Sequence, residues 1–512
     1  MPPEIDIPSI AYGALSPLLI VFGAAVVGVL VESFAPAGRR RGLQILTCTV
    51  GLLGALVAVV LLAGTHQLTI ADAIAVDGPT LFLQGVLAVL GLTGILLISE
   101  QSLDSSGGSV VASAATLPGT RDDVALAEST EVQTEVYPLA LFSIGGMMLF
   151  PAAHDLITLF IALEILSLPL YLMAGLARRR RLLSQEAAVK YFLLGAFSSA
   201  FFLYGVALLY GYAAGTTLTD VRNATAVAGS NELLLYLGLG MLTVGLLFKV
   251  GAVPFQAWTP DVYQGSPTPI TALMASCTKI AAFGALLRVF YVAFGGTQWD
   301  WRPLLWAVAI ATMVVGAVLA VTQTDVKRML AYSSVAHTGF ILVGVIALGE
   351  RGLSSTLFYL LAYGFTTLAS FAVVTLVRDA SGEATHLAQW AGLGRKSPLL
   401  AGTFAFLLFA LAGIPLTSGF IAKFAVFTAG IEGGATPLVV VGVVASAVTA
   451  FFYARVVVLM FFTEPPVDGP TVAVPSGYTA GAIALGLAVT VALGVFPQPA
   501  LDLAESAALF VR

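Results

Sequence analysis

Five ionisable side chains lie inside long apolar runs of the sequence. They are Glu164, Lys249, Lys279, His337 and Lys423. On insertion scales a charged side chain at the centre of a bilayer costs roughly 2.5–3.5 kcal/mol, so such residues are functional candidates by default. None of the five is an arginine, which keeps its proton in proteins. Burial favours the uncharged form of lysine and glutamate, so modest changes in their surroundings can make them bind or release a proton. The pattern indicates a proton-transfer path.

Each of these residues also has a purely structural interpretation. Glu164 could be the fixed partner of an ion pair between helices, and His337 could be a hydrogen-bonded core histidine. Lys249, near the end of its span, could extend its amine to the membrane surface. A pair between Glu164 and Lys249 would instead form a switch, because a nearby carboxylate favours the charged lysine and its departure favours proton release. Lys190 is a secondary proton-path candidate, and Glu186 one turn earlier could pair with it.

The composition places these residues in a membrane protein. The chain has 512 residues, of which 58% are hydrophobic and only 10% charged, whereas soluble proteins have about 25% charged residues. Apolar runs long enough to cross a bilayer recur along nearly the whole sequence. We therefore predict an all-α polytopic membrane protein with about 14 transmembrane helices. The predicted spans are roughly residues 11–33, 42–64, 79–99, 136–152, 155–176, 187–213, 232–254, 267–292, 303–322, 328–348, 354–378, 398–429, 437–462 and 477–496.

The basic residues between the spans predict the orientation of the bundle. Most of them, including Arg39 to Arg41 and Arg178 to Arg181, lie in loops that follow odd-numbered spans. Because cytoplasmic loops are enriched in Lys and Arg, we expect those loops in the cytoplasm and both termini on the outer side. Residues 100–135 are acidic and rich in Ser, Thr and Gly, which predicts a flexible cytoplasmic loop. The acidic N-terminus has no basic n-region, so we expect the first helix to be retained.

Two spans carry a matching interruption. The stretches LLFKVGAVPFQAWTPDVY and FALAGIPLTSGFIAKFAVF each place a glycine shortly before a proline in mid-membrane. A proline alone could simply kink its helix, but the matched positions of Pro254 and Pro415 predict two broken helices, 7 and 12. The breaks are five spans apart, so spans 4–8 and 9–13 are predicted to be inverted five-helix repeats around a transport site. The predicted parts are a three-helix segment (1–99), the loop (100–135), the repeats (136–292 and 303–462) and a C-terminal helix (463–512).

Several long stretches resemble one known family. HDLITLFIALEILSLPLYLMAG, EAAVKYFLLGAFSSAFFLYG, LLFKVGAVPFQAWTPDVYQGSPTPITALMASCTKIAAF, DVKRMLAYSSVAHTGF and AGIPLTSGFIAKF are similar to the antiporter-like membrane subunits of respiratory complex I, most of all to the subunit N type. By this resemblance Glu164 matches a key glutamate and Lys249 its partner lysine. Lys279 matches the next lysine, and His337 matches a histidine that links the two halves. Lys423 suits the N or L type, whereas the M type usually has glutamate there. The L type has a long C-terminal lateral helix, for which the sequence after the last span is too short.

The resemblance implies a proton-translocating subunit of NADH:quinone oxidoreductase, a translocase of the bacterial inner or plasma membrane. The implied partners are the M-type antiporter-like subunit, the small K, J and A type subunits and membrane lipids. NADH, FMN, iron–sulfur clusters and quinone are implied in partner subunits. For this chain itself we expect no cofactor, no metal site and no nucleic-acid partner. Cys48 and Cys277 fit small core residues, and the four histidines lack metal-ligand spacing.

Two other interpretations share the same charges. The first is a cation/proton antiporter subunit of the Mrp type, which co-purification with NADH dehydrogenase activity would exclude. The second is a structural subunit whose buried charges only hold helices together. Normal proton pumping by a Lys279→Ala variant would support this second interpretation.

Overall fold

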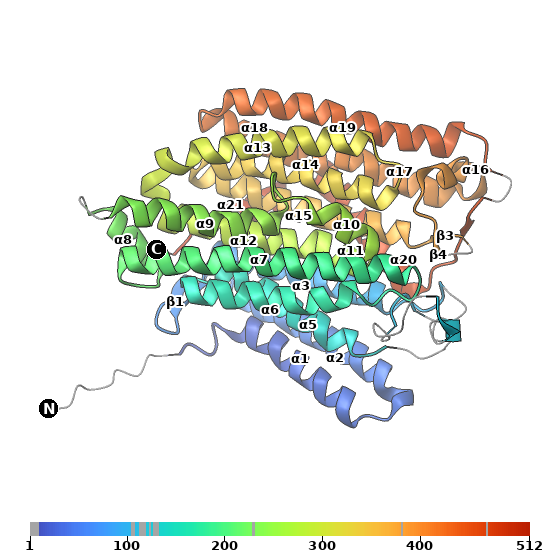
Figure 1. Cartoon of the computed structure of the whole chain (residues 1–512), viewed down its shortest axis with the longest axis horizontal. Coiled ribbons are helices and arrows are strands. Elements are labelled where there is room, and N and C mark those ends of the chain that lie inside the picture. Colours follow the sequence, from blue (N-terminus) through green and yellow to red (C-terminus); the bar gives the residue numbers. More distant parts are fainter. Residues whose placement is uncertain are drawn as a thin grey trace.

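A computed structural model gives the structure of the chain and describes residues 10–103, 108–111, 119–121, 124–125, 133–227, 231–379, 382–466 and 469–511. Its helices lie side by side in one bundle (Figure 1). The first part contains α1 (Ser16–Phe34), α2 (Ala37–Leu61) and α3 (Gly78–Ile98). The next contains α5 (Val136–Leu149), η1 (Phe150–Ala152), α6 (Leu156–Ala174), α7 (Arg181–Ala213), α8 (Leu218–Thr225), α9 (Glu232–Val250), α10 (Trp258–Gly265), α11 (Thr268–Leu273), η2 (Met274–Thr278), α12 (Lys279–Arg288), η3 (Val289–Ala293) and η4 (Gly295–Thr297).

The remaining helices complete the bundle. They are α13 (Gln298–Val321), α14 (Val326–Ala347), α15 (Gly349–Val374), η5 (Leu387–Trp390), α16 (Leu393–Lys396), α17 (Pro398–Ala412), α18 (Ser418–Glu432), α19 (Thr436–Phe462), α20 (Gly477–Val495) and α21 (Gln498–Ser506). Short strands connect some of them. β1 (Gln67–Thr69) pairs antiparallel with β2 (Ile74–Val76), and β3 (Val377–Asp379) lies between β4 (Gly382–Glu383) and β5 (Thr471–Val472).

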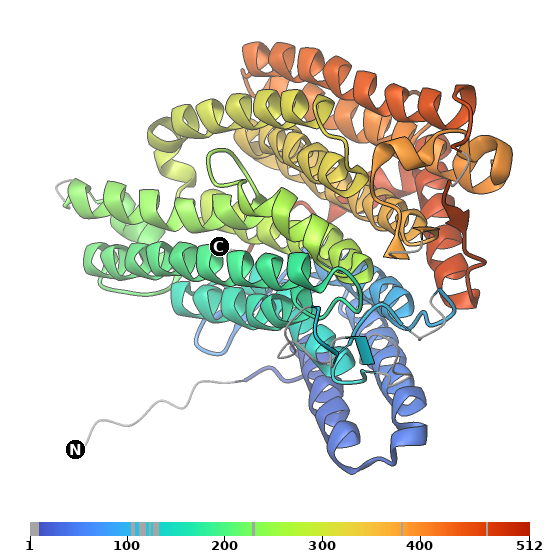
Figure 2. The same ribbon diagram turned by 45° about the vertical axis from the view of Figure 1, so that its right-hand side comes forward.

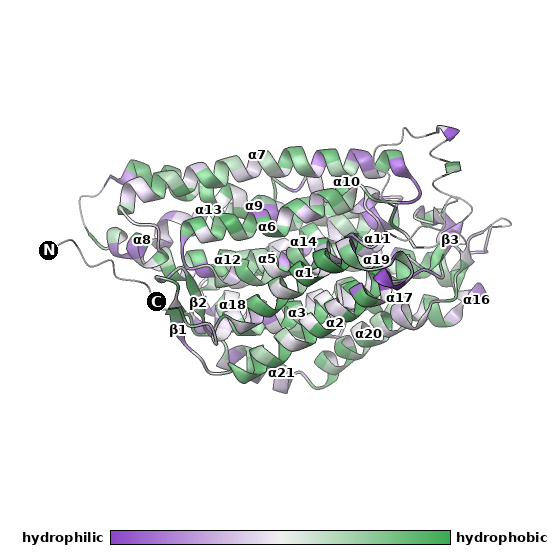
Figure 3. Ribbon diagram, turned by 90° about the horizontal axis from the view of Figure 1, so that it is seen from below, coloured by the Kyte–Doolittle hydropathy of each residue, from purple (hydrophilic) through white to green (hydrophobic). Residues whose placement is uncertain are grey.

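The helices match the predicted all-α membrane class. Within the described residues, twelve helical segments are long and apolar enough to cross a membrane, and two apolar segments, Val136–Ala152 and Pro398–Ala412, are shorter. Hydrophobic residues dominate along the helices (Figure 3). The pair α1 and α2 lies at one edge of the bundle (Figure 2). The count of 14 spans and the inverted repeats stay predictions.

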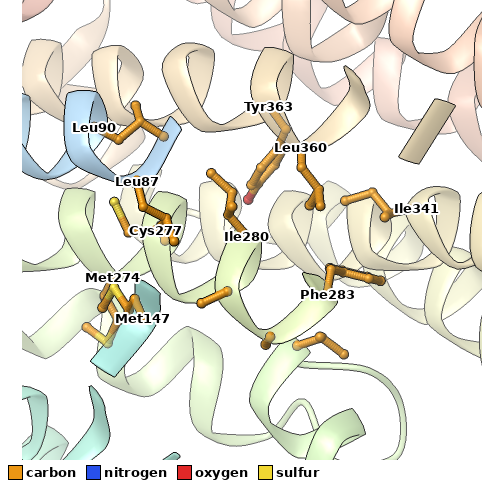
Figure 4. Packing of buried hydrophobic residues seen from close by; sticks show 14 of the residues in the cluster. Leu87, Leu90, Met147, Met274, Cys277, Ile280, Phe283, Ile341, Leu360 and Tyr363 are labelled. Carbon is orange, nitrogen blue, oxygen red and sulfur yellow. The ribbon is translucent and has the colours of Figure 1, made fainter. Parts of the chain in front are cut away.

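Burial divides the helices into inner and outer ones. The segment Thr268–Ala293 is wholly buried, and α14 and α15 are almost wholly buried, whereas most residues of α1, α7 and α20 are not buried. The exposed faces of α1 and α7 are rich in Leu, Val and Phe, which suits hydrocarbon as solvent. Leu87 of α3, Met147 of α5 and Ile280 of α12 belong to one buried hydrophobic cluster (Figure 4). The structure confirms that both cysteines are buried and unpaired.

Both predicted helix breaks are present. α9 ends at Val250, and Gly251 follows with a positive φ of 74°; α17 ends at Ala412, and Gly413 follows with a φ of 85°. In each case the next amide bonds back to a carbonyl five residues earlier, Ala252 to Leu247 and Ile414 to Phe409. This is the Schellman pattern, which needs a left-handed residue and therefore favours glycine. The chain resumes as α10 and α18, so the long twelfth span of the sequence is two helices.

Some predicted boundaries moved. The sixth span begins at Arg181, before the expected residue 187, because polar residues continue the helix past the apolar run. The short amphipathic α8 was not predicted. Much of the predicted loop 100–135 lies outside the described residues. The described ends of the chain lie at the same end of the bundle, opposite β3, β4 and α16 (Figure 1).

Candidate functional site

Lys249 occupies the last turn of α9, directly before the first break. Its side chain is 3% exposed. Its Nζ donates to Ser167 Oγ at 2.7 Å and to the hydroxyl of Tyr191 at 3.4 Å. The same nitrogen lies 5.8 Å and 5.4 Å from the ring centres of Tyr171 and Tyr191, which is close enough for cation–π attraction. The site therefore accepts the charged amine through hydroxyls and aromatic faces, and the interpretation that Lys249 reaches the membrane surface is wrong.

Glu164 lies on α6, one turn before Ser167. Its carboxylate is half-buried and accepts a hydrogen bond from Ser199 of α7. In this conformation Glu164 and Lys249 form no salt bridge, although the structure describes both residues. Ser167, three residues further along the same helix face, holds the amine instead. The predicted pairing is therefore absent in this conformation and stays a prediction.

Lys279 begins α12 and points into the second half of the bundle. It is 3% exposed, and its Nζ donates to Ser334 O and to Thr338 Oγ1, each at 2.6 Å. The ring centre of Tyr363 lies 5.5 Å away. Thr338 in turn donates to the carbonyl of Val250, the neighbour of Lys249, at 2.8 Å. One hydroxyl therefore links the surroundings of the first two lysines.

His337 lies on α14, beside the Lys279 site. Its Nδ1 is 2.7 Å from the hydroxyl of Tyr359 on α15. Lys423 lies on α18, after the second break, and is 5% exposed. Its Nζ donates to Ala412 O at 2.7 Å and to Ser446 Oγ at 2.8 Å. Ala412 is the last residue of α17, so a carbonyl released by the break now holds the lysine.

Lys190 differs from the three buried lysines. Its side chain is 40% exposed and contacts Glu186 at 2.6 Å, the partner that the sequence suggested, and Asp261 at 2.7 Å. Asp261 also bonds Arg328 at 2.7 Å, so it joins α7, α10 and α14. We did not single out Asp261 from the sequence, although it stands in the quoted stretch after the first break.

Arg288 and Asp77 form an ion pair in the core. Both side chains are fully buried, and the guanidinium holds both carboxylate oxygens at 2.7 and 3.0 Å. Arg288 therefore stabilises packing inside the bundle. Burial by itself would raise the pKa of the Asp77 carboxyl, but the charge of Arg288 and the hydrogen bonds around it hold that pKa below its ordinary value. Sequence reasoning missed Asp77, whose signal was its place before a glycine and proline at a helix start.

Known proteins are similar in sequence to this chain over nearly its whole length. The family described as NADH:quinone oxidoreductase/Mrp antiporter, TM, matches residues 153–449. NADH-quinone oxidoreductase subunit N of Parafrankia sp. (strain EAN1pec) is 64% identical, over 99% of this chain and 97% of the relative. The protein of the same name from Rhodococcus opacus (strain B4) is 60% identical, over 99% and 98% of the two chains. The chain belongs to the subunit N family.

Solved structures agree with membership of the subunit N family. A chain of respiratory complex I from Thermus thermophilus with bound aureothin is 32% identical and superposes with a TM-score of 0.77, covering 96% of this chain and 99% of that chain. A chain of the Mrp complex from Dietzia sp. DQ12-45-1b has a TM-score of 0.80 over 98% and 97% of the two chains. Its identity is 23%, so this likeness shows the shared fold alone. Relatives in sequence thus favour subunit N over an Mrp subunit.

Proposed function

We propose that this chain transfers protons across the membrane as subunit N of an NADH:quinone oxidoreductase, through Lys249, Lys279, His337 and Lys423. The observation that carries the proposal is the kind of hydrogen-bond partner that surrounds the three lysines. Each is almost completely buried, and each donates to hydroxyls or backbone carbonyls. Within the described part of the chain, none of them forms a salt bridge.

The contrast with Arg288 and Asp77 explains why the lack of a salt bridge to the three lysines matters. That buried pair keeps both charges, because each group neutralises the other. A buried lysine held only by neutral dipoles gains much less from its charge, so its charged and uncharged forms are closer in free energy. A nearby carboxylate that approaches or withdraws then changes the protonation state. Glu164 takes this role for Lys249, by exchanging Ser199 for the lysine when α6 shifts relative to α9.

The path follows the contacts in order. Thr338 bridges the Lys249 and Lys279 sites, His337 precedes Thr338 on α14, and Lys423 stands at the second break. Moving one charge against 100 mV requires about 2.3 kcal/mol, which is comparable with the free energy of one hydrogen bond to a charged group, about 1.5–3 kcal/mol. Local exchanges of partners therefore have the right size to drive the step.

The electron chemistry belongs to other subunits of the complex. NADH, FMN, iron–sulfur clusters and quinone are assigned to those subunits, and the M-type antiporter-like subunit with the small K, J and A type subunits are the proposed neighbours. Among the described residues no group of three or more His, Cys, Asp or Glu side chains could hold a metal. The arginine-rich end of the bundle is proposed to face the cytoplasm, with both termini on the outer side.

The decisive experiment replaces Lys279 by Met in the assembled complex in proteoliposomes. We expect NADH-driven acidification of the lumen to fall at least tenfold per assembled complex. The exposed Lys396 of α16, replaced by Met in the same way, is the matched control for removing a lysine and should have a smaller effect. Normal acidification by the Lys279→Met complex would overturn the proposal in favour of a structural role. Sodium-driven proton exchange without NADH would overturn it in favour of an antiporter.

A further inference from the structure

The two ring nitrogens of His337 have very different surroundings. Nδ1 is hydrogen-bonded to the Tyr359 hydroxyl at 2.7 Å. Nε2 is buried and has no hydrogen-bond partner of good geometry among the described residues, although the ring interacts with the backbone of Leu411. Buried polar atoms in proteins are nearly always satisfied, so a buried nitrogen without a well-placed partner calls for an explanation.

His337 lines a small cavity between four helices. The cavity has a volume of about 10 Å³, at the lower limit for one water molecule. Its lining includes His337 on α14, Tyr359, Tyr363 and Thr366 on α15, Leu411 on α17 and Gly419 on α18. Leu411 is the neighbour of Ala412, whose carbonyl holds Lys423. The cavity therefore lies between His337 and the break that carries the last lysine.

The Tyr359 hydroxyl has one hydrogen-bond partner in the described structure, and that partner is Nδ1 of His337. A phenol hydroxyl both donates and accepts, and a neutral imidazole carries its hydrogen on only one nitrogen. The bond made by one nitrogen decides which nitrogen carries the hydrogen. The Tyr359 oxygen can accept a hydrogen from Nδ1, and neutral His337 then has no hydrogen on Nε2.

We propose that Tyr359 is the positioning residue of His337, which rests on the proposed role of His337 in proton transfer. Its oxygen accepts the Nδ1 hydrogen and thereby leaves Nε2 as the nitrogen that binds and releases the mobile proton. When Nε2 gains a proton, the bond from Nδ1–H to the Tyr359 oxygen is kept, and loss of that proton from Nε2 restores the neutral ring. Tyr359 thus keeps the ring in one orientation in both states, so that protons leave His337 through Nε2.

A double-mutant cycle in the assembled complex tests this proposal. The variants are Tyr359→Phe, His337→Gln and both together, and the readout is the initial rate of NADH-driven acidification per assembled complex. We expect Tyr359→Phe to lower the rate about tenfold, equivalent to about 1.4 kcal/mol. The double variant should be no slower than His337→Gln, because Tyr359 acts only through the histidine. The control is Tyr291→Phe, which removes a buried hydroxyl that bonds Gly344 and Val345 of α14 but not His337.

The outcomes separate the positioning role of Tyr359 from the place of His337 in the proton path. A normal rate for Tyr359→Phe, or a loss that adds fully to that of His337→Gln, would overturn the positioning role. A loss equal to that of Tyr291→Phe would do the same, since it would show a general effect of removing a buried hydroxyl. A normal rate for His337→Gln would instead overturn the place of His337 in the proton path.

Discussion

The two glycines at the helix breaks form a matched pair that tests how Lys423 is held. Both adopt a left-handed conformation, with φ of 74° at Gly251 and 85° at Gly413. An added methyl group meets different neighbours at the two places. At Gly413 it would lie 2.9 Å from Cδ and 3.4 Å from Nζ of Lys423, whereas at Gly251 it would lie 2.9 Å from Thr259 Oγ1.

The magnitudes follow from these contacts. An alanine in the left-handed region costs roughly 1–2 kcal/mol at either glycine, so both variants should lower the thermal stability of the complex by a similar amount. Only Gly413→Ala displaces a lysine, which loses its 2.7 Å bond to the Ala412 carbonyl. A hydrogen bond from a charged donor is worth about 1.5–3 kcal/mol, and each 1.4 kcal/mol is about tenfold in rate. We therefore expect Gly413→Ala to pump protons 10- to 100-fold more slowly than Gly251→Ala.

The assay is NADH-driven acidification of proteoliposomes, normalised to the assembled complex, with the thermal midpoint of each variant measured in parallel. Equal loss of pumping in the two variants would refute the reasoning, because it would trace the effect to strain at the breaks. An unchanged rate in Gly413→Ala would show that the carbonyl at the break is not needed to hold Lys423.

Two further predictions concern stability. Asp77→Asn leaves the Arg288 charge buried without its partner, so we expect the free energy of unfolding to fall by about 3–5 kcal/mol. The measurement is a lower thermal midpoint. The double variant Asp77→Leu with Arg288→Met should lose less stability, and an equal or larger loss would contradict this account. Burial raises the pKa of Glu100, but hydrogen bonds from Ser476, Ser102 and Thr479 outweigh it and lower that pKa from 4.5 to about 2. The stability that Glu100 adds is therefore complete above pH 4.5 and is lost as the pH falls toward 2. The destabilisation by Glu100→Gln should be large at pH 7 and shrink below pH 4.5 in thermal denaturation curves, and a pH-independent difference would argue against it.

The sequence predicts the breaks and the buried charges well, because both depend on local chemistry. A proline in an apolar run cannot donate to the helix, and a glycine shortly before it allows the left-handed turn that ends the helix. A lysine in such a run must be buried or at a membrane surface. The structure confirms the breaks at Gly251 and Gly413 and the burial of Lys279 and Lys423. The function assigned to these groups stays a proposal.

The partners of the charges could not be predicted, because they come from distant parts of the chain. Arg288 and Asp77 are 211 positions apart, and Lys279 bonds residues 55 and 59 positions away. Hydrophobic periodicity says which face of a helix is buried but not which helix covers it. A serine such as Ser167 carries no signal of its own, since a buried hydroxyl more often bonds a carbonyl of its own helix.

The π-helix η2 directly before Lys279 has a consequence for insertions and deletions. Its five residues, Met274–Thr278, hold one residue more than the α-helical path between α11 and α12 requires. Each residue of an α-helix turns the chain by about 100°. Deleting one residue of η2 would therefore restore a regular α-helix and keep Lys279 facing Ser334 and Thr338, whereas inserting one further residue there would rotate Lys279 by about a quarter of a turn. The position of this lysine depends on how many residues precede it as much as on what they are.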